Sequence, residues 1–253
     1  MSKTVWITGA SSGIGEALAV AWSREGARVI LSARNEAELE RVRARCDEPS
    51  RHVVMPLDVA DMDAIGRAAR AAGDVDILVP SAGVSQRSLA IETDLATDRA
   101  IMEVNYFGTI AVTKAVLPRM LARGSGHLVP ISSVIGYVGV PLRSAYAASK
   151  HALHGFFDAL RAETHQHGIR VTIVCPGYVR TKVSENALRG DGSAYGKLDE
   201  THAKAMLPEQ AAAAIVKGVA AGRREVHVGG KEVHAIRLQR HLPGLVARVT
   251  RMK

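Results

Sequence analysis

Val5-Trp6-Ile7 runs directly into Thr8-Gly-Ala-Ser-Ser-Gly-Ile-Gly15, an apolar run followed by a glycine-rich turn. Small apolar residues at helical spacing come next, so the stretch predicts a buried strand, a tight loop and a helix in that order. Backbone without Cβ atoms can approach a pyrophosphate closely, and the N-terminus of a helix offers free N–H groups to an anion. The order of elements favours a nucleotide site over an ordinary tight turn.

Short apolar runs alternate with longer, alanine-rich stretches along the rest of the chain. The expected strands lie at residues 29–31, 53–55, 77–79, 127–129 and 171–174, with a last short strand at 225–228. Such alternation is typical of a parallel sheet covered by helices on both faces. No Pro/Ser-rich linker and no internal repeat divides the 253 residues. The sequence therefore predicts one α/β domain over residues 1–253.

A second pattern, Ser144-Ala-Tyr-Ala-Ala-Ser-Lys150, places a phenol and an ammonium four residues apart. Residues i and i+4 share one helix face, so Lys150 can stabilise the phenolate of Tyr146 and lower its pKa from a reference of about 10. A phenol with a pKa near neutrality suits general acid/base catalysis. Ser133 lies 13 residues before the tyrosine. The pair alone is common on solvated helices, and the other motifs make it informative.

Together these segments resemble the short-chain dehydrogenase/reductase family over nearly the whole chain. The family pattern T-G-x-x-x-G-x-G matches Thr8 to Gly15, and a Pro-Gly segment with a downstream Thr matches Pro176-Gly177 and Thr181. The family's catalytic quartet falls on Asn105, Ser133, Tyr146 and Lys150. The resemblance implies a single-domain Rossmann fold, with a doubly wound, parallel, seven-stranded sheet and helices on both faces.

The resemblance also implies a reaction, hydride transfer between a nicotinamide and a carbonyl or alcohol carbon. Tyr146 would donate its proton to the carbonyl oxygen, and Ser133 would hydrogen-bond that oxygen. Lys150 would bias the ionisation of the tyrosine and hydrogen-bond the nicotinamide ribose. Asn105 would hold a water that links the lysine to solvent protons. The family spacing selects Ser133 over the neighbouring Ser132.

The choice of cofactor depends on the end of the second strand, which reads Leu31-Ser-Ala-Arg-Asn35. An acid there would accept hydrogen bonds from a free ribose 2′-hydroxyl, whereas Arg34 suits a 2′-phosphate. We therefore expect NADP(H), the alternative being that Arg34 is a surface charge at a helix start. Asp58 is expected at the adenine, although it could instead cap a helix. The full set of cofactor-binding residues expected from the resemblance is Gly9, Ser11, Ser12, Gly13, Ile14, Gly15, Arg34, Asp58, Val59, Ala82, Gly83, Tyr146, Lys150, Pro176, Gly177, Val179 and Thr181.

Two prolines depart from the family pattern. The chain has Pro80-Ser81-Ala82-Gly83 where the family usually has Asn-Asn-Ala-Gly, and Pro130 lies inside the expected fifth strand. Proline cannot donate to a strand ladder. We expect a local break in pairing near these residues, with Ala82-Gly83 still able to pass under the adenosine ribose.

The substrate is only coarsely indicated. The loop at residues 134–141 is apolar, and residues 183–207 contain three glycines, as a mobile lid would. A hydrophobic ketone, aldehyde or secondary alcohol fits such walls, although Tyr137 and Val138 could equally be core residues. An alternative function is that of a β-ketoacyl-thioester reductase, because Arg119 and Arg123 could contact an acidic carrier protein. The long C-terminal segment argues against this alternative. A non-enzymatic NADP-binding sensor or scaffold would be expected to lack part of the quartet.

The C-terminal extension, residues 231–253, is basic. From Arg223 onward eight Lys/Arg face two Glu, which leaves six of the formal net charge of +8 in this part of the chain. A stripe of apolar residues at helical spacing accompanies the charge: Leu242, Leu245, Val246 and Val249. A basic amphipathic helix can lie on an anionic membrane or cover a neighbour's pocket. We favour the alternative that the stripe packs on its own domain. Nucleic-acid binding is not expected, since no aromatic residues interleave with the charges.

The remaining expectations concern cysteines, compartment and assembly. Cys46 and Cys175 belong to no Cys/His cluster, so neither a disulfide nor a metal site is expected. No apolar run of signal-peptide or membrane-span length is present, which predicts a cytoplasmic protein. The resemblance implies a homodimer or homotetramer formed through helices at residues 95–121 and 145–163.

Overall fold

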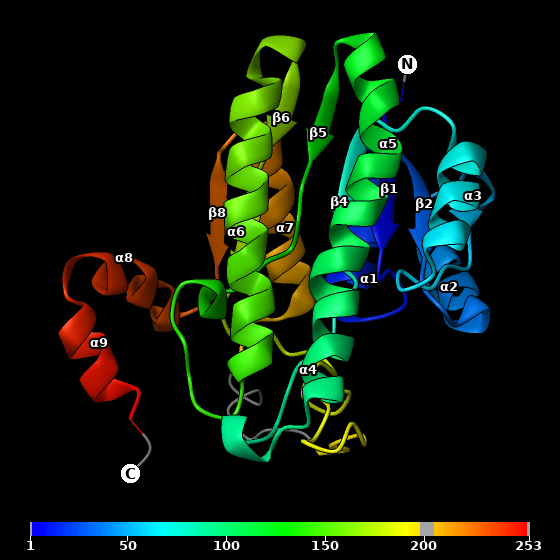
Figure 1. The fold of residues 1–253 in the computed structure, drawn as a ribbon. Helices are drawn as coiled ribbons and strands as arrows, with labels where there is room; N and C mark the ends of the chain where they lie inside the picture. The colour runs from blue at the N-terminus through cyan, green and yellow to red at the C-terminus, as the bar shows by residue number, and fades with distance from the viewer. Residues whose placement is uncertain (1, 198–204, 252–253) are drawn as a thin grey trace.

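The computed structural model describes residues 2–197 and 205–251. Its main sheet has six parallel strands in the order β3-β2-β1-β4-β5-β6, and β7 and β8 form a two-stranded parallel sheet. Figure 1 shows the strands enclosed between helices. The strands are β1 (Thr4–Thr8), β2 (Arg28–Ser32), β3 (Val53–Val54), β4 (Ile77–Pro80), β5 (Gly126–Leu128), β6 (Ile169–Val171), β7 (Ile173–Pro176) and β8 (Glu225–Val228).

The helices divide between the two faces of the sheet. In Figure 1, α5 and α6 lie in front of the strands and α1 and α7 behind them. Two buried apolar clusters correspond to these two layers. Strand β1 contributes side chains to both clusters, because successive side chains of a strand point to opposite faces of the sheet. Ile7 belongs to one cluster and Trp6 to the other. The helices are α1 (Gly13–Arg24), α2 (Glu36–Arg43), α3 (Met62–Ala72), α4 (Leu95–Met102), α5 (Thr109–Arg123), α6 (Ser144–Thr164), α7 (Pro208–Ala220), α8 (His234–His241) and α9 (Pro243–Val249).

The prediction of one seven-stranded sheet is wrong, because the stretch at residues 169–176 forms two short strands separated by Thr172. Pro130 gives the physical reason, since it lies opposite this stretch and has no N–H to donate. The β5–β6 pairing ends at Leu128 and Val171. Pairing resumes beyond the proline, where the Ser132 N–H donates to the Val174 carbonyl at 2.7 Å. The break expected from Pro130 is present.

Pro80 acts similarly on the other side of β5. The N–H groups of Val129 and Ile131 donate to the carbonyls of Leu78 and Pro80, but Pro80 has no N–H to return. The regular β4–β5 register accordingly covers two residue pairs. Both prolines therefore shorten the ladders at the carboxyl ends of the strands.

The strand order reverses between β1 and β4. Strand β1 pairs with β2 on one side and with β4 on the other, so that Ile7 lies between Leu31 and Val79. The glycine-rich loop leaves the carboxyl end of β1, and Ala82-Gly83 follows the carboxyl end of β4. In open parallel sheets ligands bind outside the carboxyl ends of the strands at such a point of reversal. The fold therefore places both segments at the expected binding crevice.

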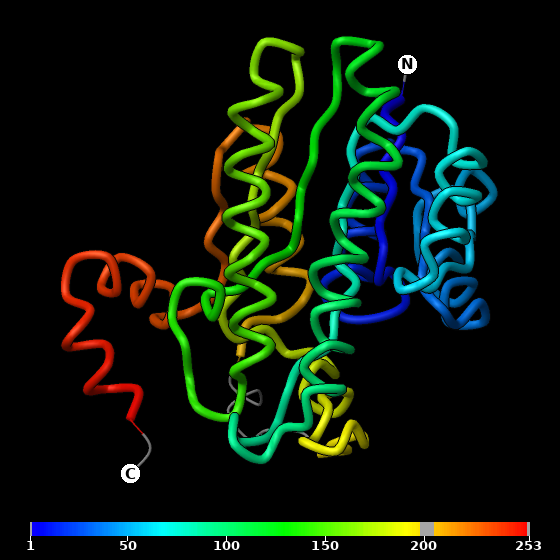
Figure 2. The backbone as a smooth tube through the Cα atoms, in the orientation of Figure 1, coloured from blue at the N-terminus to red at the C-terminus, as the bar shows by residue number. Residues whose placement is uncertain are grey.

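The C-terminal extension forms the helices α8 and α9, which reach out from the body of the protein (Figure 2). The packing that we favoured for its apolar stripe is wrong for three of four residues. Val246 is buried, but Leu242, Leu245 and Val249 are exposed. Within the described residues, no helix combines the length and the apolar character needed to cross a membrane. The expected lid at residues 183–207 lies partly outside the described residues, at 198–204.

Candidate active site

A cavity of about 990 Å³ opens at the carboxyl ends of the strands. Residues from the glycine-rich loop, the end of β2, the β4 loop, α6 and the segment after β7 share its wall. Every residue expected to bind the cofactor lines it, and so do Ser133, Tyr146 and Lys150 of the quartet. Asn105 is not part of the wall and lies fully buried.

The glycine-rich loop is closed tightly against its surroundings. Gly9 has φ +68°, and a Cβ there would lie 2.7 Å from the Ala82 nitrogen. A Cβ on Gly15 would lie 2.2 Å from the Gly9 carbonyl oxygen. The Thr8 hydroxyl accepts hydrogen bonds from the N–H groups of Ser81 and Ala82 at 3.2 and 3.3 Å, which joins the loops after β1 and β4. The loop therefore has room for backbone only.

The loop also leads into a helix start that suits an anion. Ser12 is the N-cap residue of α1, and its side chain makes no capping hydrogen bond. The first N–H groups of a helix need acceptors and carry positive potential. Together with the close backbone packing at Gly9 and Gly15, this arrangement fits the pyrophosphate of a dinucleotide.

Lys150 and Tyr146 share one face of α6, as their spacing predicts, with the Lys150 Nζ 5.8 Å from the centre of the Tyr146 ring. The expected lowering of the phenol pKa by the lysine is wrong for this structure. Burial raises the pKa of Tyr146, and the opposing influences are the charge of Arg143 and a hydrogen bond with Ser133. Burial also lowers the pKa of Lys150 to about 8. Desolvation therefore shifts the pKa of each group in the direction that favours its neutral form.

The two adjacent serines have different partners. Ser133 donates to the Pro176 carbonyl at 3.3 Å, and its hydroxyl acts on Tyr146 by opposing the rise in the pKa of the phenol. The Ser132 hydroxyl lies 3.1 Å from the Lys150 carbonyl and 2.9 Å from Nε2 of His154. Ser133 is thus the serine that acts on the phenol, whereas Ser132 ties its loop to the backbone and side chains of α6.

Asn105 lies in a π-helical segment, Glu103–Gly108, between α4 and α5. Such segments are rare and often occur at functional sites. The Asn105 amide accepts from the Val84 N–H at 2.8 Å and donates to the Val84 carbonyl and the Ser149 hydroxyl, both at 2.9 Å. A Cβ on Gly83 would lie 3.1 Å from Asn105 Oδ1 and 3.5 Å from Lys150 Nζ. Asn105 and Lys150 therefore both lie close to Gly83, with Lys150 in the cavity wall and Asn105 buried behind it.

Gln86 caps α6, although no local sequence pattern indicates this role. Its buried amide oxygen accepts from the N–H groups of Ala145 at 2.8 Å and Tyr146 at 3.4 Å. Its amide nitrogen donates to the hydroxyls of Ser88, Thr93 and Ser144. The residue therefore satisfies N–H groups of the first turn of α6. Only the folded chain brings it there, since 59 residues separate Gln86 from Ala145.

The role of Glu232 likewise depends on a contact between distant parts of the folded chain, so the sequence does not predict it. Its Oε1 accepts from the N–H groups of Tyr178 at 2.8 Å and Gly230 at 2.9 Å. A Cβ on Gly177 would lie 2.2 Å from the same oxygen. Glu232 therefore holds the Pro176-Gly177 segment from the C-terminal extension, and it also lines the cavity.

The two residues expected at the adenosine end line the cavity and remain exposed to solvent. Arg34 immediately precedes Asn35, which caps α2 by accepting from the Glu38 N–H at 3.2 Å. Asp58 does not cap a helix, because Asp61 performs that role for α3. The Asp58 carboxylate instead accepts from the Ala60 N–H at 3.0 Å, which folds the turn beside the cavity.

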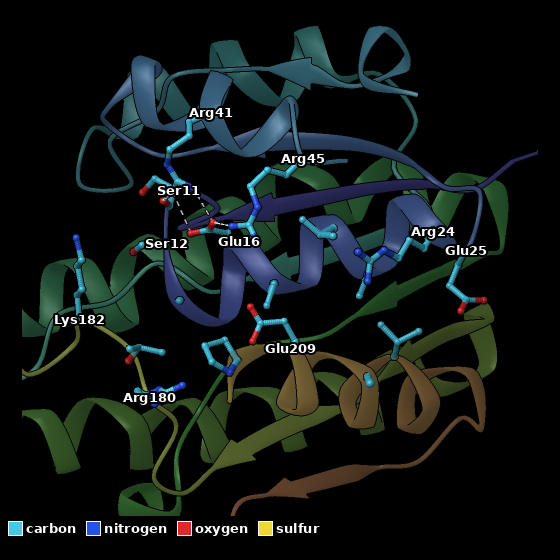
Figure 3. A pocket seen from close by; sticks show the side chains of 18 of the residues that line it. Ser11, Ser12, Glu16, Arg24, Glu25, Arg41, Arg45, Arg180, Lys182 and Glu209 are labelled. Atoms are coloured by element: carbon cyan, nitrogen blue, oxygen red, sulfur yellow. Dashed lines mark hydrogen bonds and ion pairs between the residues drawn. The ribbon is translucent and has the colours of Figure 1, made fainter. Parts of the chain in front are cut away.

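A second cavity, of about 660 Å³, lies on the outer side of the glycine-rich loop. Figure 3 shows Arg41 and Arg45 of this cavity pointing toward Glu16. Arg41 also donates to the Ser11 carbonyl at 3.2 Å and so ties the loop to α2. Burial alone would raise the pKa of Glu16, but the two arginines lower it. Arg41 is a further contact of the loop that the sequence did not reveal.

The remaining wall of the main cavity is largely apolar. Val138 lines it and is buried, whereas Tyr137 packs its ring on His154 with a 4.3 Å centroid distance and donates to Glu225 at 2.5 Å. Tyr137 is thus a packing residue and Val138 a wall residue. Further apolar wall residues come from the loop after Ser133, the described part of residues 183–207, and the C-terminal helices: Val134, Val140, Leu188, Leu238, Val246 and Val249. Within the described parts of the chain, no group of His, Cys, Asp and Glu is arranged to hold a metal ion.

Comparisons with known proteins agree with this geometry. The sequence model described as short chain dehydrogenase matches residues 3–191. The chain is 45% identical to a Drosophila melanogaster protein named dehydrogenase/reductase SDR family protein 7-like, over 95% of this chain and 76% of that protein. The crystal structure of a short-chain dehydrogenase from Streptomyces avermitilis matches with a TM-score of 0.84 and 32% identity, over 99% of this chain and 96% of that one.

A short chain dehydrogenase from Burkholderia cenocepacia, solved in complex with NADP, also has a TM-score of 0.84, with 27% identity over 99% of this chain and 98% of that one. The family match covers most of the chain, and the similarity to relatives extends over nearly all of it. The chain belongs to the short-chain dehydrogenase/reductase family of oxidoreductases, whose members use nicotinamide cofactors.

Proposed function

We propose that this protein is an NADP(H)-dependent oxidoreductase that interconverts a carbonyl group and a secondary alcohol on a hydrophobic substrate. One observation carries the proposal: Tyr146, Ser133 and Lys150 line the same cavity as the glycine-rich loop. A proton-transfer group and a dinucleotide site therefore open into one space, as hydride transfer requires.

The residues of the site have separate roles in this reaction. The glycine-rich loop would hold a nicotinamide dinucleotide, which would supply the hydride for reduction of the carbonyl carbon. Tyr146 donates its phenolic proton to the carbonyl oxygen, and the Ser133 hydroxyl orients that oxygen. The raised pKa of Tyr146 keeps the phenol protonated at neutral pH, so the proton that reduction consumes is present on the side chain. Lys150 donates to the Ile131 carbonyl at 2.9 Å and keeps its ammonium beside Tyr146, where it can return a proton.

The preference for NADP(H) is supported by Arg34. It lines the cavity directly after β2, with no carboxylate between Leu31 and Asn35. A guanidinium there can pair with a 2′-phosphate, while a free ribose hydroxyl would lack its usual carboxylate partner. The NADP complex of the Burkholderia cenocepacia relative supports the same choice.

The apolar walls support a hydrophobic substrate. A ketoacyl thioester on an acidic carrier is less well supported, because Arg123 is already paired with Asp74 at 3.2 Å and donates to the Val75 carbonyl at 2.7 Å. We further propose that the protein is a homo-oligomer, as members of the family commonly are.

A depletion screen tests the proposal. NADPH or NADH is mixed with the protein and a panel of ketones, aldehydes and ketoacyl thioesters, and absorbance at the nicotinamide band is followed. We expect turnover with hydrophobic ketones or aldehydes, with NADPH preferred. Tight NADPH binding without turnover of any substrate in either direction would favour a sensor or scaffold instead, and preferred use of the thioesters would favour the carrier-dependent reductase.

A further inference from the structure

The C-terminal helices combine three properties that are rarely found together on a free surface. They expose large apolar side chains, they carry a concentrated positive charge, and they line the main cavity. The name C-terminal surface is used below for its exposed residues Arg240, Leu242, Leu245, Arg248, Val249 and Arg251.

The apolar part of this surface is largely open to solvent. Val246 is 5% exposed, whereas Leu245 is 46% and Val249 is 74% exposed. Successive residues of a helix differ by about 100° in direction, so Leu245 points well away from the buried Val246. Arg248 lies three residues after Leu245 and therefore neighbours it on the helix. The outer side of α9 is thus an apolar strip bordered by a cation.

The positive charge of the C-terminal surface limits the kinds of partner that can bind to it. From His234 to Arg251 the chain has four arginines and no Asp or Glu. Glu232, just before this stretch, is already held by the N–H groups of Tyr178 and Gly230. A symmetric contact between two copies would bring these arginines together without compensating acids. An anionic lipid surface offers both negative headgroups for the arginines and an apolar interior for the leucines.

We propose that the C-terminal surface docks on an anionic lipid bilayer, with Leu242, Leu245 and Val249 entering the boundary between headgroups and acyl chains. The docking residues and the cavity wall belong to the same helix, since Val246 and Val249 line the cavity. The substrate therefore enters along α9 from the lipid phase. This last step rests on the proposed function, whereas the docking itself does not.

Vesicle co-sedimentation tests the docking without any turnover, so its outcome is independent of the proposed reaction. The full chain is mixed with vesicles of phosphatidylcholine containing one fifth phosphatidylserine, and with vesicles of phosphatidylcholine alone, at low and moderate salt. We expect binding to the anionic vesicles that weakens with salt, and little binding to the neutral ones. Absence of binding to the anionic vesicles, or equal binding to both kinds, would overturn the proposal.

Paired variants locate the contact. Leu245→Ser should lower partitioning about tenfold through lost apolar burial, and Arg248→Gln about fivefold through lost charge. The control Met62→Ser changes a side chain of nearly equal exposure, 45%, on α3. The control Arg67→Gln removes an exposed arginine on the same helix. Equal losses in variants and controls would show that the contact lies elsewhere.

Light scattering after size-exclusion chromatography distinguishes lipid from a second copy. We expect Leu245→Ser to leave the molar mass of the protein unchanged while its vesicle binding falls. A lower molar mass for this variant, with vesicle binding unaffected, would assign the surface to a subunit interface and overturn the proposal. The circular dichroism of each variant checks that the exposed substitutions leave the fold intact.

Discussion

Lys150 donates a 2.9 Å hydrogen bond to the carbonyl of Ile131, two residues before Ser133. The bond joins α6 to the segment that leads into Ser133, so Lys150 has a structural partner as well as Tyr146, the neighbour that we propose is catalytic. Lys150 and Ile131 are both buried. An ammonium with one carbonyl partner loses more hydration than it regains, and burial lowers its pKa to about 8.

The lowered pKa of Lys150 predicts a pH dependence of stability. Its ordinary value is 10.5, so between about pH 8 and 10.5 the unfolded chain binds more protons at this position than the folded chain. The free energy of unfolding therefore rises with pH in this window as far as Lys150 contributes. Relative to Lys150→Met, the wild type should gain roughly 3 kcal/mol between pH 7.5 and 10.5. Urea unfolding at several pH values measures the difference.

The control for this experiment is Lys217→Met, which removes an exposed lysine on α7. It should show the same pH dependence as the wild type. Parallel curves for the wild type and Lys150→Met would contradict a buried ammonium with a lowered pKa.

Tyr146→Phe should remove the proton donor and little else. The ring still fills its place on α6, while the hydroxyl that meets Ser133 is lost. We expect the dissociation constant of NADPH to stay within about twofold and kcat to fall by roughly a thousandfold or more. Fluorescence titration and steady-state kinetics provide the two numbers. Substantial residual turnover would refute the role of the phenol.

Gln86 should affect Tyr146 through the helix start. Gln86→Leu leaves the N–H groups of Ala145 and Tyr146 without an acceptor, so the free energy of unfolding should fall by about 1–3 kcal/mol. Gln86→Glu keeps a carboxylate acceptor beside the positive end of α6 and should recover part of that loss. Chemical denaturation measures both. If Gln86 positions the phenol of Tyr146, kcat should fall in Gln86→Leu while the dissociation constant of NADPH stays unchanged. Equal free energies of unfolding for Gln86→Leu and Gln86→Glu would exclude the capping role.

The sequence predicted those parts of the fold and site that depend on short spacings. The glycine-rich turn and the start of α1 lie within the seven residues from Gly9 to Gly15, and Tyr146 and Lys150 share a helix face by periodicity alone. The missing N–H group of a proline is also a property of a single residue, so the sequence predicts the break in strand pairing at Pro130. The sequence does not predict how this break changes the number of strands in the sheet, because that depends on which segment lies opposite the proline.

The features of the site that the sequence does not predict depend on long-range contacts and on burial. Gln86 reaches Ala145, and Glu232 reaches Tyr178, only after the sheet has brought distant loops together. The pKa of Tyr146 was predicted in the wrong direction because spacing indicates which charge is near but not how much water is excluded. Which side of the C-terminal stripe faces the protein is likewise set by tertiary packing.

Arg34 should determine the preference between the two nicotinamide dinucleotides. Arg34→Ala removes the guanidinium that we propose pairs with the 2′-phosphate, so kcat/KM for NADPH should fall by about tenfold to a hundredfold while that for NADH changes little. Arg43→Ala, on the exposed end of α2, is the matched control and should leave the ratio unaltered. Steady-state rates with each dinucleotide give the ratio. An unchanged ratio in Arg34→Ala would return this residue to the role of a surface charge.

A side chain at Gly177 should displace Glu232, because a Cβ there would lie 2.2 Å from Glu232 Oε1. Gly177→Ala must displace the carboxylate that accepts from Tyr178 and Gly230, and we expect a loss of about 1–3 kcal/mol in unfolding free energy with weakened NADPH binding. Gly139→Ala is the matched control, since a Cβ there meets nothing within 4 Å.

A double-mutant cycle with Glu232→Ala separates the clash from the lost hydrogen bonds. Glu232→Ala alone removes the acceptor of two N–H groups, and Gly177→Ala alone both crowds and displaces it. When the carboxylate is already absent, adding the methyl group should cost little further stability, so the double variant should be less destabilised than the sum of the single ones. Thermal or urea unfolding of the four proteins measures the coupling. Simple additivity would mean that Gly177 and Glu232 act independently, and that the C-terminal extension does not hold the wall of the cavity through this contact.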